Sequence, residues 1–289
     1  MKQRSKSAVG VVIAGLVPAL LGGPVFALAW LLFCSIGYRE FRRLAAGVGA
    51  DPGPYFALAL PAAAAAAYFD AGPWAITATI FGVSMLGLAI MMRGADLDGL
   101  FERFAFGTAA VVYLGIPVFT TISLRELEGS INDNWLAGFV DWRSMPWDAN
   151  PRGLAWFLVV LCTTWLCDSG QYLVGRTFGK TPLSPRISPK KTVEGFLGGL
   201  VVAAGSGALA VSLFGLDINP LAGALTGAVL AVVAISGDLS ESIFKRQAGV
   251  KDSGDFIPGH GGMLDRIDSL LFTFSTGWIL ALMFDGYFW

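Results

Sequence analysis

The sequence predicts an all-α protein that crosses a membrane several times. Of its 289 residues, 55% are hydrophobic and 14% are charged, whereas a soluble domain has about 25% charged residues. The mean hydropathy is +0.64. Several charge-free stretches approach the ~20 residues that a helix needs to cross about 30 Å of hydrocarbon. These stretches are continuously apolar and do not alternate in polarity, which disfavours a membrane β-barrel.

About nine apolar segments are predicted to cross, provided that the chain turns within residues 8–37. The turn is expected at Gly22-Gly23-Pro24, because glycine and proline together interrupt a helix. The first arm is short, so a tilted, re-entrant or partly interfacial arrangement of it stays open. The predicted segments are residues 8–21, 24–37, 54–70, 74–92, 104–123, 154–175, 193–214, 219–236 and 269–287.

The placement of positive charge predicts a cytoplasmic N-terminus. In that orientation 17 of the 20 Lys and Arg residues face the cytoplasm, and the exceptions are Arg125, Arg143 and Arg152. This agrees with the positive-inside rule, whereas a single crossing through residues 8–37 would invert every later loop. A signal peptide that ends near residues 26–29 is the alternative for the basic, apolar start. The apolar run is longer than a usual signal core.

The polar residues are concentrated in the C-terminal half of the chain. Residues 1–124 are interpreted as transmembrane scaffold helices with short loops. Residues 125–152 form the longest external loop, and its tryptophans suit a membrane interface. Residues 153–289 are predicted to form the catalytic transmembrane region, with polar cytoplasmic loops at 176–192 and 237–268.

The densest polar segment, residues 242–268, reads SIFKRQAGVKDSGDFIPGHGGMLDRID. Basic side chains, aspartates and glycines in one segment are a composition suited to phosphates and a metal ion. The only histidine of the chain, His260, lies between glycines that allow a ligand to approach the backbone closely. Because no Ser or Cys is paired with it, we interpret His260 as a phosphate contact or a loop-ordering residue.

A second polar segment, residues 184–195, reads SPRISPKKTVEG. Prolines at 182, 185 and 189 forbid a continuous helix there. Thr192 is suited to cap a helix that begins at Val193. Such a helix N-terminus next to lysines favours anion binding, although a plain basic cytoplasmic loop would have the same composition.

Five carboxylates from four predicted helices are expected to meet at the cytoplasmic side of the membrane. Carboxylates at this depth are costly unless they are paired or bind a metal. Oxygen ligands without Cys or His partners suit magnesium rather than zinc. Three helix-terminal aspartates beside basic residues are the simpler alternative. The five residues are Asp168, Glu194, Asp238, Asp265 and Asp268.

These segments resemble the motifs of the bacterial phosphatidate cytidylyltransferases, also called CDP-diacylglycerol synthases. The signature of that family is matched at every defined position by Ser242-x-Phe244-Lys245-Arg246-x4-Lys251-Asp252-x-Gly254-x2-Ile257-Pro258-x-His260-Gly261-Gly262-Met263-x-Asp265-Arg266-Ile267-Asp268. Two further motifs are resembled by Ser188-Pro189-Lys190-Lys191-Thr192-x-Glu194-Gly195 and Asp168-x3-Tyr172-x2-Gly175. Gln171 departs from the pattern, since relatives usually carry a small residue there.

The resemblance implies a reaction of CTP with phosphatidic acid that gives CDP-diacylglycerol and pyrophosphate. It also implies a magnesium cofactor, with a second metal or a monovalent cation left open, and a homodimer in the bacterial cytoplasmic (inner) membrane that binds no nucleic acid. The expected catalytic residues are Asp238, Asp265, Lys245 and Arg266, and the expected metal ligands are Asp238, Asp265 and Asp268. The expected substrate-binding residues are Asp168, Ser188, Lys190, Lys191, Thr192, Glu194, Arg246, Lys251, Asp252 and His260.

Two other functions remain as alternatives on the sequence alone. A CTP-dependent lipid kinase would need the same metal, nucleotide and anionic lipid, but it would release CDP. A transporter or flippase for anionic lipids would also use carboxylates within the membrane. It would move lipid without consuming nucleotide, and it leaves the glycine-rich basic segment unexplained.

Overall fold

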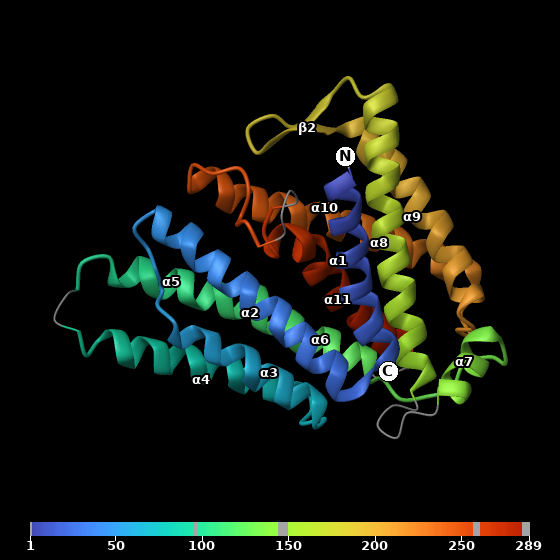
Figure 1. Cartoon of the computed structure of the whole chain (residues 1–289), viewed down its shortest axis with the longest axis horizontal. Helices are drawn as coiled ribbons and strands as arrows, with labels where there is room; N and C mark the ends of the chain where they lie inside the picture. Colours follow the sequence, from blue (N-terminus) through green and yellow to red (C-terminus); the bar gives the residue numbers. More distant parts are fainter. Residues whose placement is uncertain (1, 95–96, 144–149, 257–260, 285–289) are drawn as a thin grey trace. The chain divides into compact units, whose positions relative to one another are not determined.

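The computed structural model of the chain describes residues 2–94, 97–143, 150–256 and 261–284 (Figure 1). The chain forms two compact units. One contains Met1–Ser123 and Ile243–Ile267, and the other contains Leu124–Ser242 and Asp268–Trp289. Most of the polar segment 242–268 therefore folds with the N-terminal helices that the sequence marks only as scaffold.

Seven helices in the described ranges are long and apolar enough to cross a membrane. Two further apolar helices, Val12–Leu21 and Tyr55–Tyr68, are shorter. They correspond to the predicted segments 8–21 and 54–70, so the structure supports seven of the nine predicted crossings by length. The seven are Gly23–Gly47, Trp74–Met91, Leu100–Arg125, Pro151–Phe178, Val193–Leu213, Pro220–Gln247 and Leu264–Phe284.

The first unit begins with α1 (Lys2–Leu21) and α2 (Gly23–Gly47), which pack against each other. The predicted break between them is confirmed, because Gly22 and Gly23 have φ angles of 66° and 51°. Side chains rarely tolerate such angles, so glycine is needed there. The remaining helices are η1 (Tyr55–Leu58), α3 (Ala59–Tyr68), α4 (Pro73–Met91), α5 (Leu100–Ala110), the π-helical turn η2 (Val111–Gly115) and part of α6 (Ile116–Arg125).

The second unit is built on α8 (Pro151–Phe178), α9 (Val193–Leu213) and most of α10 (Pro220–Gln247). Glycines let these helices approach closely, as is common between membrane helices. A Cβ atom at Gly207 of α9 would overlap the carbonyl oxygen of Gly223 of α10, and one at Gly227 would overlap the carbonyl oxygen of Ala203. The helix α11 (Leu264–Phe284) contributes most of its length to this unit.

Three segments differ from the sequence-based expectation. The non-helical segment predicted at 176–192 contains two short strands that were not predicted, β1 (Pro182–Ser184) and β2 (Ser188–Thr192), which form an antiparallel hairpin beside the end of α8 (Figure 1). The prolines exclude a helix there, and the strands pair instead. The segment predicted as an external loop, residues 125–152, contains a short helix, α7 (Trp135–Arg143).

The loop predicted at 237–268 is also shorter than expected. Helix α10 continues to Gln247 and α11 begins at Leu264. Lys245 and Arg246 therefore lie in the last turn of α10. We call residues 248–256 and 261–263, which lie between the two helices, the cassette loop. The basic residues 245 and 246 also suit a helix C-terminus, where the helix dipole favours positive charge.

The packing of α9 on α10 can be tested with two neighbouring glycines of α9. Gly207→Ala is expected to lower the thermal unfolding temperature, because the added methyl group has no space next to Gly223 and Gly227. Overpacking of this kind costs about 1–3 kcal/mol. Gly205→Ala is the matched control, since nothing lies within 4 Å of its Cβ position. Equal unfolding temperatures for the two variants in detergent would contradict the packing.

Candidate active site

In the second unit, residues from three elements gather around one aspartate. Lys191 of β2 places its Nζ atom 2.5 Å from Oδ2 of Asp238 on α10. The Lys191 side chain is 21% exposed and that of Asp238 is 34% exposed. Asp168 of α8 interacts electrostatically with both residues. Three residues that the sequence analysis selected from separate segments of the chain therefore form one charged cluster, which we call the Asp238 cluster.

The position of Lys191 follows from local structure at the start of α9. Thr192 caps that helix, since its Oγ1 atom accepts a hydrogen bond of 3.1 Å from the backbone N–H of Gly195. The predicted cap is thus confirmed. The N–H of Val193 donates to the carbonyl oxygen of Thr181 at 2.9 Å. Strand β2 consequently runs directly into α9, and Lys191 is fixed one residue before the cap.

Glu194 holds the base of the hairpin. Its carboxylate accepts hydrogen bonds from the backbone N–H of Lys180 at 3.0 Å and from the N–H and hydroxyl of Thr181 at 3.1 Å and 2.9 Å. The sequence analysis named Glu194 among the five carboxylates at the cytoplasmic side and among the expected substrate-binding residues. In the structure it binds the backbone that precedes β1.

In the first unit, Lys245 of α10 and Asp265 of α11 form a second ion pair. Their Nζ and Oδ1 atoms lie 2.6 Å apart. The other oxygen, Oδ2, accepts hydrogen bonds from the N–H and hydroxyl of Ser253, both at 2.9 Å, and from the N–H of Gly262 at 2.8 Å. Both oxygens of Asp265 are therefore bound within the protein.

Glu40 is a residue of this region that sequence reasoning missed. It lies on α2, is 2% exposed, and receives the N–H groups of Met263 and Leu264 at 2.9 Å and 2.7 Å. The hydroxyl of Ser253 also lies 3.1 Å from it. One signal was present in the sequence: the residues just before α11, Gly261-Gly262-Met263, include no side chain that can cap a helix.

The glycines of the cassette loop make room for these two carboxylates. A Cβ atom at Gly254 would lie 2.6 Å from Oε1 of Glu40, and one at Gly262 would lie 2.5 Å from its Oε2. Gly261 has a φ angle of 84°, and its Cβ would lie 2.7 Å from Oδ2 of Asp265. At these three positions the backbone approaches protein side chains.

The other predicted residues are distributed as follows. Arg246 donates to the carbonyl oxygen of Val250 at 3.3 Å. Asp268 is buried, and its Oδ1 atom accepts the N–H of Ser269 at 2.7 Å. His260 lies outside the described residues. The exposed side chains are those of Lys190, Lys251, Asp252 and Arg266, while Ser188 is partly buried.

Within the described residues, no group of three or more His, Cys, Asp or Glu side chains is arranged to hold a metal. Magnesium does not require such a group, because it usually binds one or two carboxylates together with substrate phosphates and water. Asp238 suits this role best, since its carboxylate is the most accessible of the three predicted ligands. Asp265 would have to exchange the lysine that it now binds. The magnesium assignment stays a prediction.

Gln171, which departs from the motif on α8, is accommodated by a glycine. A Cβ atom at Gly199 of α9 would overlap Cγ of Gln171. The amide nitrogen of Gln171 donates to the sulfur of Cys167 at 3.2 Å. The larger side chain therefore fills space that a small residue would leave open between α8 and α9.

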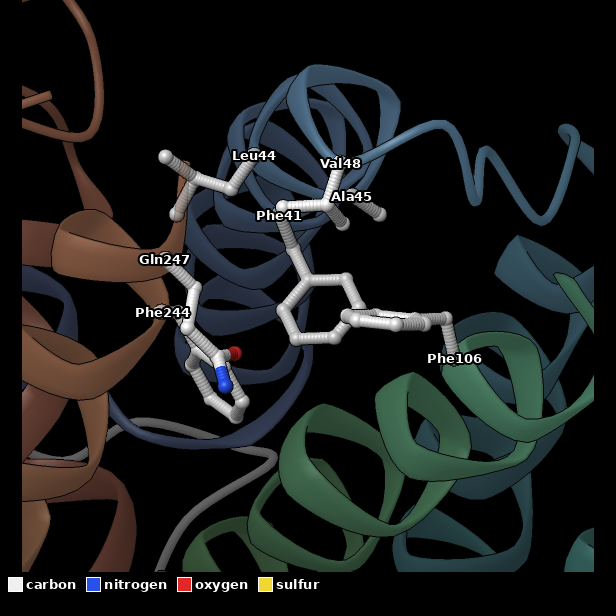
Figure 2. Close-up of a pocket in the computed structure, with 7 residues that line it drawn as sticks. All are labelled: Phe41, Leu44, Ala45, Val48, Phe106, Phe244 and Gln247. Carbon is white, nitrogen blue, oxygen red and sulfur yellow. The ribbon is translucent and has the colours of Figure 1, made fainter. Parts of the chain in front are cut away.

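Figure 2 shows a small apolar pocket in the first unit, where the end of α2 meets α5 and the end of α10. The ring centroids of Phe41 and Phe244 lie 5.3 Å apart in an edge-to-face arrangement. This contact fixes the residue next to Lys245. Gln247 supplies the only side-chain polar group, so the lining offers no charged group to a substrate. The lining residues are Phe41, Leu44, Ala45, Val48, Phe106, Phe244 and Gln247.

The long apolar helices are those of a membrane protein. The Asp238 cluster and the Lys245–Asp265 ion pair each contain a lysine that suits an anionic ligand. The chain belongs to the cytidylyltransferase family, whose model matches residues 2–284. It is 33% identical to a phosphatidate cytidylyltransferase of Synechocystis over 94% of this chain and 93% of the relative. A Staphylococcus epidermidis enzyme of the same name is 31% identical over 94% and 95%. One from Pseudomonas aeruginosa is 51% identical over 39% and 42%.

The role of Glu194 can be tested by limited proteolysis. In Glu194→Ala, the hairpin loses the acceptor for three donors, and we expect trypsin to cleave at Lys180 and Arg186 several-fold faster than in wild type. The control is Asp217→Ala, an exposed aspartate of the same unit. Cleavage at the wild-type rate would show that the Glu194 contacts do not hold the hairpin.

Proposed function

We propose that this chain is a phosphatidate cytidylyltransferase, which converts CTP and phosphatidic acid to CDP-diacylglycerol and pyrophosphate. Membership of the cytidylyltransferase family and the relatives that align over nearly the whole chain support this activity. The observation that carries the proposal is the Asp238 cluster, where Lys191 of the basic hairpin meets Asp238 and Asp168.

The reaction presents an electrostatic problem more than a proton-transfer problem. A phosphate oxygen of phosphatidic acid attacks the α-phosphorus of CTP, the new P–O bond forms, and the bond to the β-phosphate breaks as pyrophosphate leaves. Both reactants are anions, so their approach must be offset by positive charge and fixed in line. Lys191 and Lys245 supply that charge from β2 and α10, and Arg246 and Lys251 extend it.

We further propose Asp238 as a ligand of the magnesium ion, and Asp265 and Asp268 stay the other two ligands that the family resemblance implies. The bound ion would neutralise the triphosphate and orient it. In the structure Asp238 and Asp265 each form an ion pair with a lysine. These lysines are then placed to pass from a carboxylate to a substrate phosphate. Asp168 keeps a second negative group beside Lys191.

The membrane placement that suits this chemistry puts the N-terminus, the hairpin and the cassette loop in the cytoplasm. This placement agrees with the positive-inside rule, because it leaves most Lys and Arg residues on the cytoplasmic side. The water-soluble nucleotide then reaches the site from the cytoplasm while the lipid arrives within the bilayer. We propose the bacterial inner membrane as the location, with about nine crossings if the two short apolar helices also span, and a homodimer as the assembly.

A single assay separates the candidate functions. Purified protein in detergent is supplied with labelled CTP, phosphatidic acid and magnesium. The proposed activity releases pyrophosphate and yields CDP-diacylglycerol, whereas a lipid kinase would release CDP. A flippase would move lipid in vesicles without any nucleotide turnover. Absence of CDP-diacylglycerol from folded wild-type protein would refute the proposed function.

Asp238→Ala is expected to abolish turnover, with a loss of at least about 100-fold, because removing one preorganised charged group at a reacting centre costs that much or more. Asp265→Ala is expected to do the same. Both variants should still insert and elute as folded protein on size-exclusion chromatography. Near-normal activity in either folded variant would remove that aspartate from the proposed metal site.

Lys191→Ala is expected mainly to raise KM for CTP, by about tenfold, which corresponds to the loss of one charge-assisted hydrogen bond. Arg186→Ala is the matched control, since this exposed residue lies in the same hairpin and has no assigned role. Steady-state kinetics at varied CTP distinguish the two variants. An unchanged KM in Lys191→Ala would require a different assignment for the hairpin.

A further inference from the structure

Glu40 lies in the part of the chain where the sequence shows no catalytic motif. It nevertheless forms hydrogen bonds with the cassette loop and with the start of α11. Its partners are Ser253, near the middle of the loop, and Met263 with Leu264, at the start of α11. Two backbone N–H groups therefore donate to one carboxylate, and the Ser253 hydroxyl, which has a single proton, lies between this carboxylate and that of Asp265. A carboxylate that is 2% exposed is costly unless such donors compensate for its lost hydration.

This requirement restricts where the loop can lie. The N–H groups of Met263 and Leu264 belong to the start of α11, where helical N–H groups have no acceptor within the helix. Local residues offer no capping side chain, so Glu40 serves as the acceptor from α2. Gly37, one turn earlier on α2, would place a Cβ atom 3.5 Å from Leu264. Helix α2 therefore packs against the start of α11 at ordinary van der Waals distance.

Ser253 connects Glu40 to Asp265. Its hydroxyl oxygen lies 3.1 Å from Oε2 of Glu40 and 2.9 Å from Oδ2 of Asp265, and its N–H also donates to Asp265. Asp265 in turn binds Lys245. A displacement of the Glu40 carboxylate would move Ser253 and the start of α11, and both of these hold Asp265.

We infer that Glu40 is a positioning residue for cytidylyl transfer: it fixes the cassette loop so that Asp265 and Lys245 keep the geometry that the reaction uses. This inference rests on the proposed function. It assigns to a residue of α2 a task in the chemistry of a loop more than 200 positions later in the chain. Glu40 acts through these partners and is assigned no contact with a substrate.

The central test is Glu40→Gln. The substitution keeps the size of the side chain but replaces one acceptor oxygen with an N–H donor that faces backbone N–H groups. We expect kcat to fall by about 100-fold, the effect of a misplacement of about 1 Å at a reacting group. Because alignment is lost, kcat and kcat/KM for CTP should fall together.

Hydrogen exchange provides the readout that separates positioning from general stability. In Glu40→Gln, the amides of Met263 and Leu264 should exchange faster, while peptides from α8 and α9 stay unchanged. Glu102→Gln is the matched control, because Glu102 is an exposed glutamate in the same unit. Glu40→Asp, which keeps the charge but is one methylene shorter, should recover part of the lost kcat.

Ser253→Ala tests the connection without altering the bonds from Glu40 to α11. A loss of about tenfold in kcat is expected, as for one hydrogen bond to a charged group. The double variant should lose less than the product of the two single losses, since both act on Asp265.

The inference is overturned if folded Glu40→Gln keeps kcat within about twofold of wild type. A lower yield or unfolding temperature with unchanged kcat per folded molecule would overturn it as well. If Glu40→Gln does not fold, a wild-type kcat in Ser253→Ala would also overturn the inference. A wild-type protein that makes no CDP-diacylglycerol would instead refute the proposed activity, and exchange at Met263 and Leu264 would still report on the loop.

Discussion

The hydrogen bonds between the Glu40 carboxylate and the backbone at the start of α11 determine how the polar loop is attached to the membrane helices. They satisfy two needs with one contact: a buried charge gains donors, and the first turn of a helix gains an acceptor. The glycines of the cassette loop follow from this contact, because any Cβ atom at Gly254 or Gly262 would displace Glu40. Loop sequence and helix sequence are therefore constrained together.

The same physical rule appears in the second unit with different residues. Asp238 is accompanied by Lys191, as Asp265 is by Lys245. In both cases a carboxylate on a long membrane helix is neutralised by a lysine from another element. Such pairs are stable without substrate and still contain mobile, strongly charged groups. A protein that brings two anions together benefits from lysine side chains that are held in place before the substrates bind. In the free protein the aspartates balance the charge of these lysines.

Much of this arrangement could be predicted from the sequence, because hydropathy and caps are local signals. The break at Gly22-Gly23, the cap at Thr192 and the helical setting of Asp168 needed no distant partner to be recognised. The hairpin was missed because strands of three and five residues carry little periodicity. Glu40 was missed because its partners are 213 to 224 positions away, and no local pattern reports such a separation. The lysine partners of the aspartates were likewise not predictable from spacing.

The separation of Glu40 from its partners also bears on how the protein is made. Ribosomes add roughly 5–20 residues per second, so Glu40 emerges on the order of 10–40 seconds before Ser253, which lies 213 positions later. During that interval α2 carries a glutamate with none of its final donors. Glu40 lies seven positions before the end of α2 at Gly47, and a charged side chain costs less near the end of a membrane helix than at its centre. Biogenesis thus favours a glutamate near the end of the span over one at its centre.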